Sequence, residues 1–300
     1  MMKSVFSFFI LLELNRKEEK MKKNLFILLL LFMMVPGVVS AYENYYEVSM
    51  SEDEYNNLLE LGFTEEEIYY MDESEFNNNK VIVGNLEAVS ERYFVNIVRY
   101  DATGKIISNN DMEVTEEDYN NDGIMLLSAD GYIETTYKQM RTTIAAASSK
   151  YRYKITLTWK KMPAVRSYDI IGIGFDSIVF LDSSLVFNQT SCISTTCTNS
   201  TAINGSNISS LSGVGVSFKL PTSTSITTLR SYFYFDVSKN TSSTITEMYA
   251  YGDYSHATSS ITSGLAQNFY VNQAGIMLSS SISSYYDAIS TADAVWNGSW

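Results

Sequence analysis

The residue best suited to catalysis is the single histidine of the chain, His256. As a general base it would activate a serine hydroxyl, with Asp169, Asp176 or Asp253 as the carboxylate that orients its ring. The sequence contains no G-x-S-x-G nucleophile motif, however, and serine is so frequent that any histidine has one nearby. We therefore expect His256 to be a polar loop residue, and an esterase-like hydrolase is the alternative.

Two carboxylates on an aromatic-rich scaffold suffice for glycoside hydrolysis, so the acids of the C-terminal half are a second route to a hydrolase. Residues 131–300 contain nine acidic side chains, and acids of this kind mostly serve in turns or ion pairs. Their separation in space does not follow from the sequence, so no catalytic residue is assigned. The acids in or beside expected strands are Asp169, Asp176, Asp182, Asp236, Glu247 and Asp253.

Asp118, Asn120 and Asp122 are the candidate metal ligands. With Gly123 they match the opening D-x-[DN]-x-[DN]-G of a calcium loop, in which short oxygen side chains converge. The twelfth position of that loop, which should be a bidentate glutamate, is Ala129. A turn in an acidic linker explains the same residues, so we expect no cofactor, with calcium as the alternative. A zinc site needs several histidine or cysteine ligands, which this chain does not supply.

Cys192 and Cys197 are the two cysteines of the chain. An even number of cysteines in an exported protein predicts a disulfide, here one that closes a tight loop. The four residues between them do not match the C-x-x-C spacing of redox catalysts. A structural disulfide is therefore expected.

A basic segment without any acid is the strongest candidate for a binding surface. Three of its side chains share the polar face of one expected strand, where they would suit an anionic wall polymer or an acidic glycan, with tyrosine rings stacking on sugars. The same face would also suit the acidic first part of the chain, and a solvated strand face is the third interpretation. The segment contains Lys138, Arg141, Lys150, Arg152, Lys154, Lys160, Lys161 and Arg166, of which we predict Arg152, Lys154, Lys160, Lys161 and Arg166 to bind the ligand.

The acidic first part of the mature chain is expected to form a small α+β headpiece over residues 42–120. Residues 42–130 carry 22 acidic and 4 basic side chains, a balance of −18. Thr64 and Glu67 have the spacing of a capping box at a helix start, and Gly62 is a helix stop before it. Two apolar strand patterns flank a turn at 101–104 and predict a hairpin.

The remainder of the chain has the patterns of an all-β domain. Residues 151–159 alternate between apolar and polar side chains, which is typical of a half-buried strand. Several further short apolar runs come after it, separated by turn-forming residues. We therefore predict a mainly β fold, in which a linker at 121–130 leads to an antiparallel β-sandwich of jelly-roll or immunoglobulin-like kind over 131–300.

The N-terminal residues indicate export. From Met21 the chain has the three parts of a secretory signal, namely two lysines, an apolar run over 25–35 and a small-residue end. We predict a signal peptide over 21–41, a mature chain that starts near Tyr42, and a secreted protein without a transmembrane anchor after cleavage. Residues 1–20 do not fit this plan, and we hypothesise that they are a translated leader ahead of the true start.

These patterns favour a non-enzymatic binding or envelope-associated protein, because no catalytic motif is present. The acidic half disfavours nucleic acid and anionic lipid as partners, since phosphate repels it. In general layout the chain resembles the short signal-bearing proteins that low-GC Gram-positive bacteria export. Two alternatives stay open, a secreted hydrolase and a membrane-active toxin in which the Ser/Thr-rich strands 223–228 and 241–246 rearrange into a pore.

Overall fold

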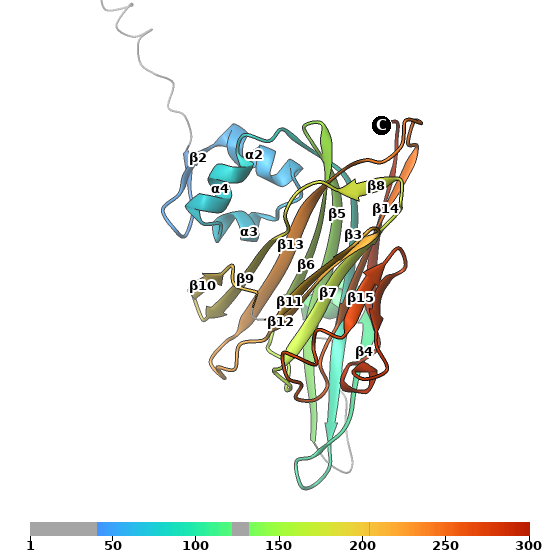
Figure 1. Ribbon diagram of the computed structural model, residues 1–300. Coiled ribbons are helices and arrows are strands. Elements are labelled where there is room, and N and C mark those ends of the chain that lie inside the picture. Colours follow the sequence, from blue (N-terminus) through green and yellow to red (C-terminus); the bar gives the residue numbers. More distant parts are fainter. Residues whose placement is uncertain (1–40, 122–131, 204) are drawn as a thin grey trace, which may run out of the picture. The chain divides into compact units, whose positions relative to one another are not determined.

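The computed structural model describes residues 41–121, 132–203 and 205–300 (Figure 1). The leader and most of the signal peptide, together with Asp122 of the calcium motif, lie outside the described residues. The first strands are β1 (Ala41–Glu43) and β2 (Ser49–Ser51). Residues 43–49 and 53–300 belong to one compact unit, which contains the two main sheets, one of eight strands and one of five.

The larger sheet has eight antiparallel strands among the described residues. Its order is β10-β9-β13-β6-β5-β3-β4, and β8 pairs with β13 as well. The strands are β3 (Gly84–Tyr100), β4 (Ile106–Val114), β5 (Tyr132–Ala147), β6 (Lys150–Trp159), β8 (Val179–Leu181), β9 (Val186–Ile193), β10 (Thr196–Ser200) and β13 (Thr228–Lys239).

The smaller sheet has five antiparallel strands in the part of the chain that is described, in the order β11-β12-β7-β14-β17. A separate hairpin of β15 (Phe269–Asn272) and β16 (Gly275–Leu278) and a short 3-10 helix η1 (Ser283–Tyr285) accompany it. Its strands are β7 (Tyr168–Phe175), β11 (Ser206–Ser210), β12 (Gly213–Lys219), β14 (Glu247–Ser255) and β17 (Ser290–Asn297).

The hydrophobic core lies between the two sheets. Strand β6 contributes every second residue, from Tyr151 to Trp159, and β13 contributes Phe233 and Phe235. Strands of the smaller sheet supply the facing layer, with Ile171 and other apolar residues of β7, β12, β14 and β17. The mainly β fold and the antiparallel sandwich predicted from the alternation are therefore confirmed.

Three short helices lie against the outer face of the larger sheet, beside β9 and β13 (Figure 1). They are α2 (Glu52–Glu60), α3 (Glu65–Tyr69) and α4 (Glu73–Asn79). The predicted capping box is present, because the Thr64 amide donates to Glu67 Oε2 at 2.8 Å and the Glu67 amide donates to Thr64 Oγ1 at 3.2 Å. Gly62 follows α2 with φ +90°, as expected of a helix stop.

The predicted hairpin exists as β3 and β4, joined by the turn around Gly104. This hairpin is not part of a separate unit, however. Strand β3 also pairs with β5 over its whole length and therefore belongs to the larger sheet. Phe94 of β3 points into the sandwich core, which gives these strands a reason to join it. The acidic segment thus supplies both part of the sheet and the helices that cover it. A fourth helix, α5 (Glu116–Asn121), follows β4.

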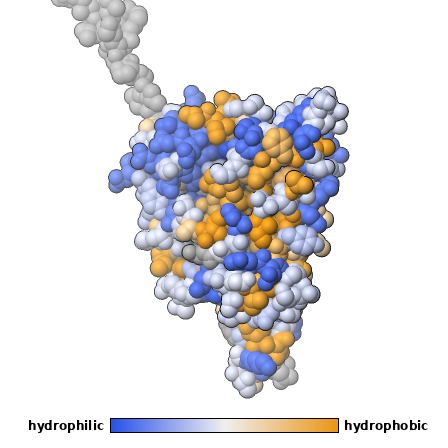
Figure 2. Space-filling model, viewed as in Figure 1, coloured by the Kyte–Doolittle hydropathy of each residue, from blue (hydrophilic) through white to orange (hydrophobic). Residues whose placement is uncertain are grey.

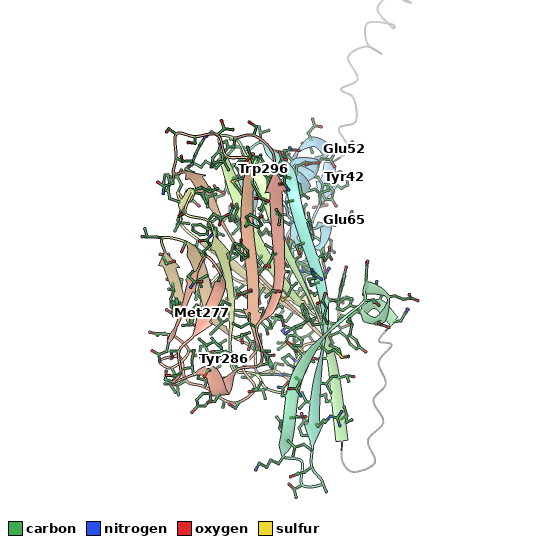
Figure 3. The ribbon with its side chains drawn as sticks, turned by 90° about the vertical axis from the view of Figure 1, so that its right-hand side faces the viewer. Tyr42, Glu52, Glu65, Met277, Tyr286 and Trp296 are labelled. Carbon is green, nitrogen blue, oxygen red and sulfur yellow. A yellow bond between two sulfur atoms is a disulfide. The ribbon has the colours of Figure 1, made fainter. Side chains whose placement is uncertain are left out.

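The outer face of the smaller sheet carries two pairs of facing glycines. Gly172 of β7 lies opposite Gly215 of β12, and Gly174 lies opposite Gly213. The β15–β16 hairpin packs directly on them, so a Cβ on Gly174 would lie 2.3 Å from the Asn272 carbonyl oxygen. In Figure 3 Met277 of β16 and Tyr286 lie at the lower left of the sandwich, and Trp296 lies near its top. The absence of side chains therefore allows this third layer to approach the sheet.

No helix in the described ranges is long and apolar enough to cross a membrane.

We expect Gly174→Ala to lower the free energy of unfolding by about 2–3 kcal/mol, because the new methyl group displaces hairpin backbone. Gly264→Ala is the matched control, since its Cβ meets nothing within 4 Å, and its effect is expected within about 0.5 kcal/mol. Urea denaturation of both variants measures this. Equal stability of the two would show that the hairpin does not press on the sheet.

Candidate functional site

The five predicted ligand-binding residues do not share one open face. Arg152 and Lys154 are buried, with 3 % and 0 % of their surface exposed. Lys160 donates to the Tyr119 carbonyl oxygen, and Lys161 is exposed at 3.6 Å from Glu134. Arg166 donates to the carbonyl oxygens of residues 222 and 223. β6 ends at Trp159, so the last three leave the sheet face that Arg152 and Lys154 share.

Helix α3 covers Lys154 with a carboxylate. Lys154 Nζ lies 2.7 and 2.6 Å from the two carboxylate oxygens of Glu67, and the Thr156 hydroxyl donates to the same carboxylate at 2.6 Å. Burial raises the pKa of Glu67, but the charges of Lys154 and Arg230 more than offset it, so the pKa lies below its ordinary value. Burial lowers the pKa of Lys154 to about 8, with Glu67 opposing that change. Both groups are therefore charged at neutral pH.

Helix α4 covers the neighbouring side chains of β9 and β13. Glu75 Oε2 accepts hydrogen bonds from the Tyr232 hydroxyl at 2.7 Å and from Asn188 Nδ2 at 3.2 Å. Asn79 accepts from Arg152 and donates to the Tyr234 hydroxyl at 3.0 Å. Of the three interpretations that the sequence leaves open for this polar face, the structure agrees with cover by the acidic segment. The face is buried, and Lys154, Arg152 and Tyr232 bind residues of the helices.

Apolar contacts complete the attachment of the helices. Phe63, which is 1 % exposed, packs edge-to-face on Tyr232 and Tyr234 with ring centroids 6.2 and 5.5 Å away. Lys154 Nζ lies 5.3 Å from the centre of the Phe63 ring, on the same side of the sheet. The acidic helices are held by buried charges and aromatic packing together.

A pocket of about 310 Å³ remains where the helices stop covering the sheet. Its floor comes from three adjacent strands, because Thr158 of β6 faces Gln139 of β5 on one side and Arg230 of β13 on the other. Glu65 lies on the helical side of the molecule, where hydrophilic surface gathers (Figures 2 and 3). The lining residues are Thr64, Glu65, Glu66, Gln139, Arg141, Thr156, Thr158 and Arg230.

The two arginines of the pocket differ in their partners. Arg141 Nη1 donates to the Gly62 carbonyl oxygen at 2.8 Å. Arg230 pairs with Glu66, and the guanidinium side chain is 4 % exposed whereas that of Glu66 is 57 % exposed. Arg141 belongs to the basic segment found in the sequence, but Arg230 does not. Only the register of β13 against β6 reveals that Arg230 joins this face.

His256 follows the end of β14 and lies outside the strands, as expected of a loop residue, but it is buried in the interior. It is fully buried, and its Nδ1 lies 3.0 Å from Asp169 Oδ1. Asp169 also accepts from the Tyr254 hydroxyl and from the Ala257 amide at 2.9 Å. Burial lowers the pKa of His256, and the Asp169 charge more than offsets it, so the pKa is raised. The imidazole does not face a site open to a substrate.

The other candidate acids are dispersed. Asp236 pairs with Arg152 at 2.8 Å, Asp182 pairs with Lys150 at 2.8 Å, and Asp253 accepts from the Ile276 amide at 2.7 Å. Asp176 accepts from Gln273, and Glu247 begins β14. The first four of these acids each have a structural partner, as is usual for acids in turns and ion pairs. They are Asp236, Asp182, Asp253 and Asp176.

The metal candidates Asp118 and Asn120 lie in α5, where Asp118 accepts from the Thr115 hydroxyl at 2.8 Å. Throughout the described ranges, no group of three His, Cys, Asp or Glu side chains is placed to hold a metal ion. Because Asp122 is outside those ranges, the alternative of calcium binding there is not tested. The disulfide between Cys192 and Cys197 is confirmed, and it joins facing residues of β9 and β10.

Comparisons with known proteins assign no family. No family model matches the chain, and no curated protein matches it. Among solved structures, the collagen-binding domain of the surface protein RspB of Erysipelothrix rhusiopathiae aligns with 72 % of this chain and 84 % of its own length. The identity is 8 % and the TM-score is 0.24, a likeness too low to carry an argument about function.

Glu75 should make the stability of the covered face depend on pH. Burial raises its pKa from 4.5 to about 7, against the hydrogen bonds from Tyr232 and Asn188. The folded state therefore holds this proton more tightly than the unfolded state, and the resulting stability is lost as pH rises through about 7. Glu75→Gln removes the ionisation, so its melting temperature should exceed that of the wild type by an amount that grows from about pH 4.5 to about pH 7 and then levels off.

At pH 8 the free energies of unfolding of Glu75→Gln and the wild type are expected to differ by about 3 kcal/mol at most, as the change in pKa implies. Glu73→Gln, an exposed change in the same helix, is the control and should follow the wild type at every pH. Parallel melting curves of Glu75→Gln and wild type would contradict this account.

Proposed function

We propose that the protein is an exported, non-enzymatic binding module that holds an acidic group of an extracellular glycan or wall polymer in the pocket beside α3. The observation that carries this proposal is the unequal burial of the Arg230–Glu66 pair. The guanidinium is fixed in the floor of the pocket, while the carboxylate that neutralises it is mostly in solvent.

Exchange of Glu66 for a ligand carboxylate costs little. Glu66 is 57 % exposed, so it can turn into water without burying its charge when another anion takes its place. The buried guanidinium of Arg230 still needs an anion, because an unpaired buried charge is strongly unfavourable. An incoming carboxylate or phosphate meets this need and forms charge-assisted hydrogen bonds.

Neighbouring side chains suit the rest of a sugar ring. Arg141 supplies a second positive charge from β5, which β6 separates from the β13 strand of Arg230. Thr158 and Gln139 supply neutral groups that both donate and accept. The signal sequence expected at 21–41 supports the setting, since export brings such a pocket to wall and matrix polymers. The binding role therefore moves from Arg152 and Lys154, which α3 and α4 cover, to Arg141 and Arg230.

Binding to a polyuronic acid tests the proposal, with the methyl ester of the same polymer as the uncharged comparison. Arg230→Gln should weaken binding of the acidic polymer tenfold or more, which is about 1.4 kcal/mol. Glu66→Gln should strengthen it, because the competing carboxylate is gone. Isothermal titration or biolayer interferometry measures both.

Arg92→Gln is the matched control, since Arg92 is an exposed arginine paired with Glu113 outside the pocket. It should leave binding unchanged. Equal binding of the acidic polymer and its ester, or equal losses in the Arg92 and Arg230 variants, would contradict the proposal.

A further inference from the structure

A second buried lysine lies inside the sandwich, apart from the pocket. Lys138 of β5 contacts the Asp111 carboxylate of β4, and the exposed fractions of the two side chains are 0 % and 5 %. Both point to the same face of the sheet across β3, because Lys138 faces Phe94 and Asp111 faces Asn96, two residues further along β3. The pair therefore bridges the edge strand and the third strand of the sheet.

Aromatic rings surround the Lys138 amine. Its Nζ lies 4.3 Å from the ring centre of Tyr254, 5.4 Å from that of Trp159 and 5.5 Å from that of Phe94. In such surroundings a charged pair is costly, and transfer of one proton from the ammonium to the carboxylate removes both charges. The product of that transfer is a neutral amine in contact with a carboxylic acid.

A second carboxyl group stands beside the pair. Asp287 Oδ1 accepts from the His256 amide at 2.7 Å, while Asp287 Oδ2 is buried and meets no donor among the described residues. A proton on Asp287 Oδ2 would let this oxygen donate a hydrogen bond to Asp111, which gives the buried atom a partner. Consistently, burial and the Asp111 carboxylate raise the pKa of Asp287 to about 8, whereas Lys138 and His256 oppose the change. Asp287 is thus an acid at neutral pH.

The other buried lysine pair lacks this third group. Lys154 and Glu67 are equally buried, but Glu67 accepts from the Thr156 hydroxyl and lies near the Arg230 charge, both of which keep it ionised. No neutral carboxyl group in the described ranges donates to Glu67. The described chain therefore contains one pair arranged for condensation and one arranged as a stable ion pair.

We propose that Lys138 and Asp111 condense into an intramolecular amide bond, with Asp287 as the proton relay. After proton transfer within the pair, the Nζ lone pair attacks Cγ of Asp111 while Asp287 donates its proton to the carboxyl oxygen. The C–N bond forms and one C–O bond breaks. One of the two amine protons passes through Asp287 to the hydroxyl group that leaves as water, and the other stays on the amide nitrogen. The carboxyl oxygen that remains returns its proton to Asp287. An ammonium and a carboxylate become one amide and one water, so no further reactant is needed.

The bond would tie β4 to β5 over β3. These three strands continue past the sandwich at the lower end of Figure 1, with β4 at the edge of the sheet. An edge strand has neighbours on one side only, and it is the part of a sheet that separates most readily. A covalent bridge fixes it without any metal or second disulfide.

Trypsin digestion of the purified full-length chain, with the N-terminus read from the same spectra, tests the proposal. Trypsin cuts after free lysine, so the unlinked protein gives a peptide of residues 106–138. The linked protein should resist cleavage at Lys138 and give residues 106–141, lighter by one water. Further cleavage after glutamate should leave two peptides joined through Lys138 and Asp111. Cleavage after Lys154 should be normal, which makes the second pair an internal control.

Complete cleavage at Lys138 with an unchanged mass would overturn the proposal. A succinimide at Asp122 also removes one water, but it leaves Lys138 open to trypsin, so this result counts against the amide too. Asp287→Asn should remain folded by circular dichroism and lack the link, with a lower melting temperature. A complete link in that variant would contradict the relay role of Asp287.

Discussion

Two positive charges buried on the outer face of the larger sheet dictate how the acidic segment is used. Arg152 and Lys154 lie on β6, where the opposite face already fills the sandwich core. Solvent cannot compensate their charges once a layer covers them, so the layer must bring anions and acceptors of its own. From this layer Glu67 meets Lys154 and Asn79 meets Arg152, while Asp236 of β13 pairs with Arg152 from within the sheet. Loss of one partner leaves the other charge unpaired in the interior.

The same sheet face divides into a closed part and an open part. Helices α3 and α4 cover the β6 and β13 residues nearest to them, while Arg141, Arg230 and Thr158 line the pocket at the border. Some of the acidic side chains of residues 42–130 are therefore paired with basic side chains of the same protein. A site with two arginines and two exposed glutamates is nearly neutral. In the proposed function, an acidic ligand would enter by replacing a carboxylate that is already there.

Local patterns in the sequence predicted the features that depend on neighbours along the chain. The capping box of Thr64 and Glu67, the alternation of β6, and the disulfide of Cys192 and Cys197 all result from short spacing. The mainly β sandwich results from the repetition of such strands. Each of these features depends on residues within one turn, one strand or one hairpin.

Features that depend on register across distant segments were not predicted. Lys154 and Glu67 are 87 residues apart in sequence, and nothing in the sequence pairs them. For His256 the sequence offered Asp169, Asp176 and Asp253 as partners, and only the fold selects Asp169. A polar alternation shows that a strand has two different faces, but not whether helices cover the polar one. The glycine pairs of β7 and β12 likewise acquire their meaning only when the strands are aligned. The basic segment was recognised from composition, yet its open part was completed by Arg230 from another strand.

A double-mutant cycle between Glu67 and Lys154 tests the central claim most directly, namely that a buried ion pair holds the acidic helices on the sheet. Glu67→Gln and Lys154→Met should each lower the free energy of unfolding by about 3–5 kcal/mol, because each leaves an unpaired buried charge. The double variant should lose less than the sum, with a coupling of at least about 1 kcal/mol. Additivity of the two changes within about 0.5 kcal/mol would contradict the account.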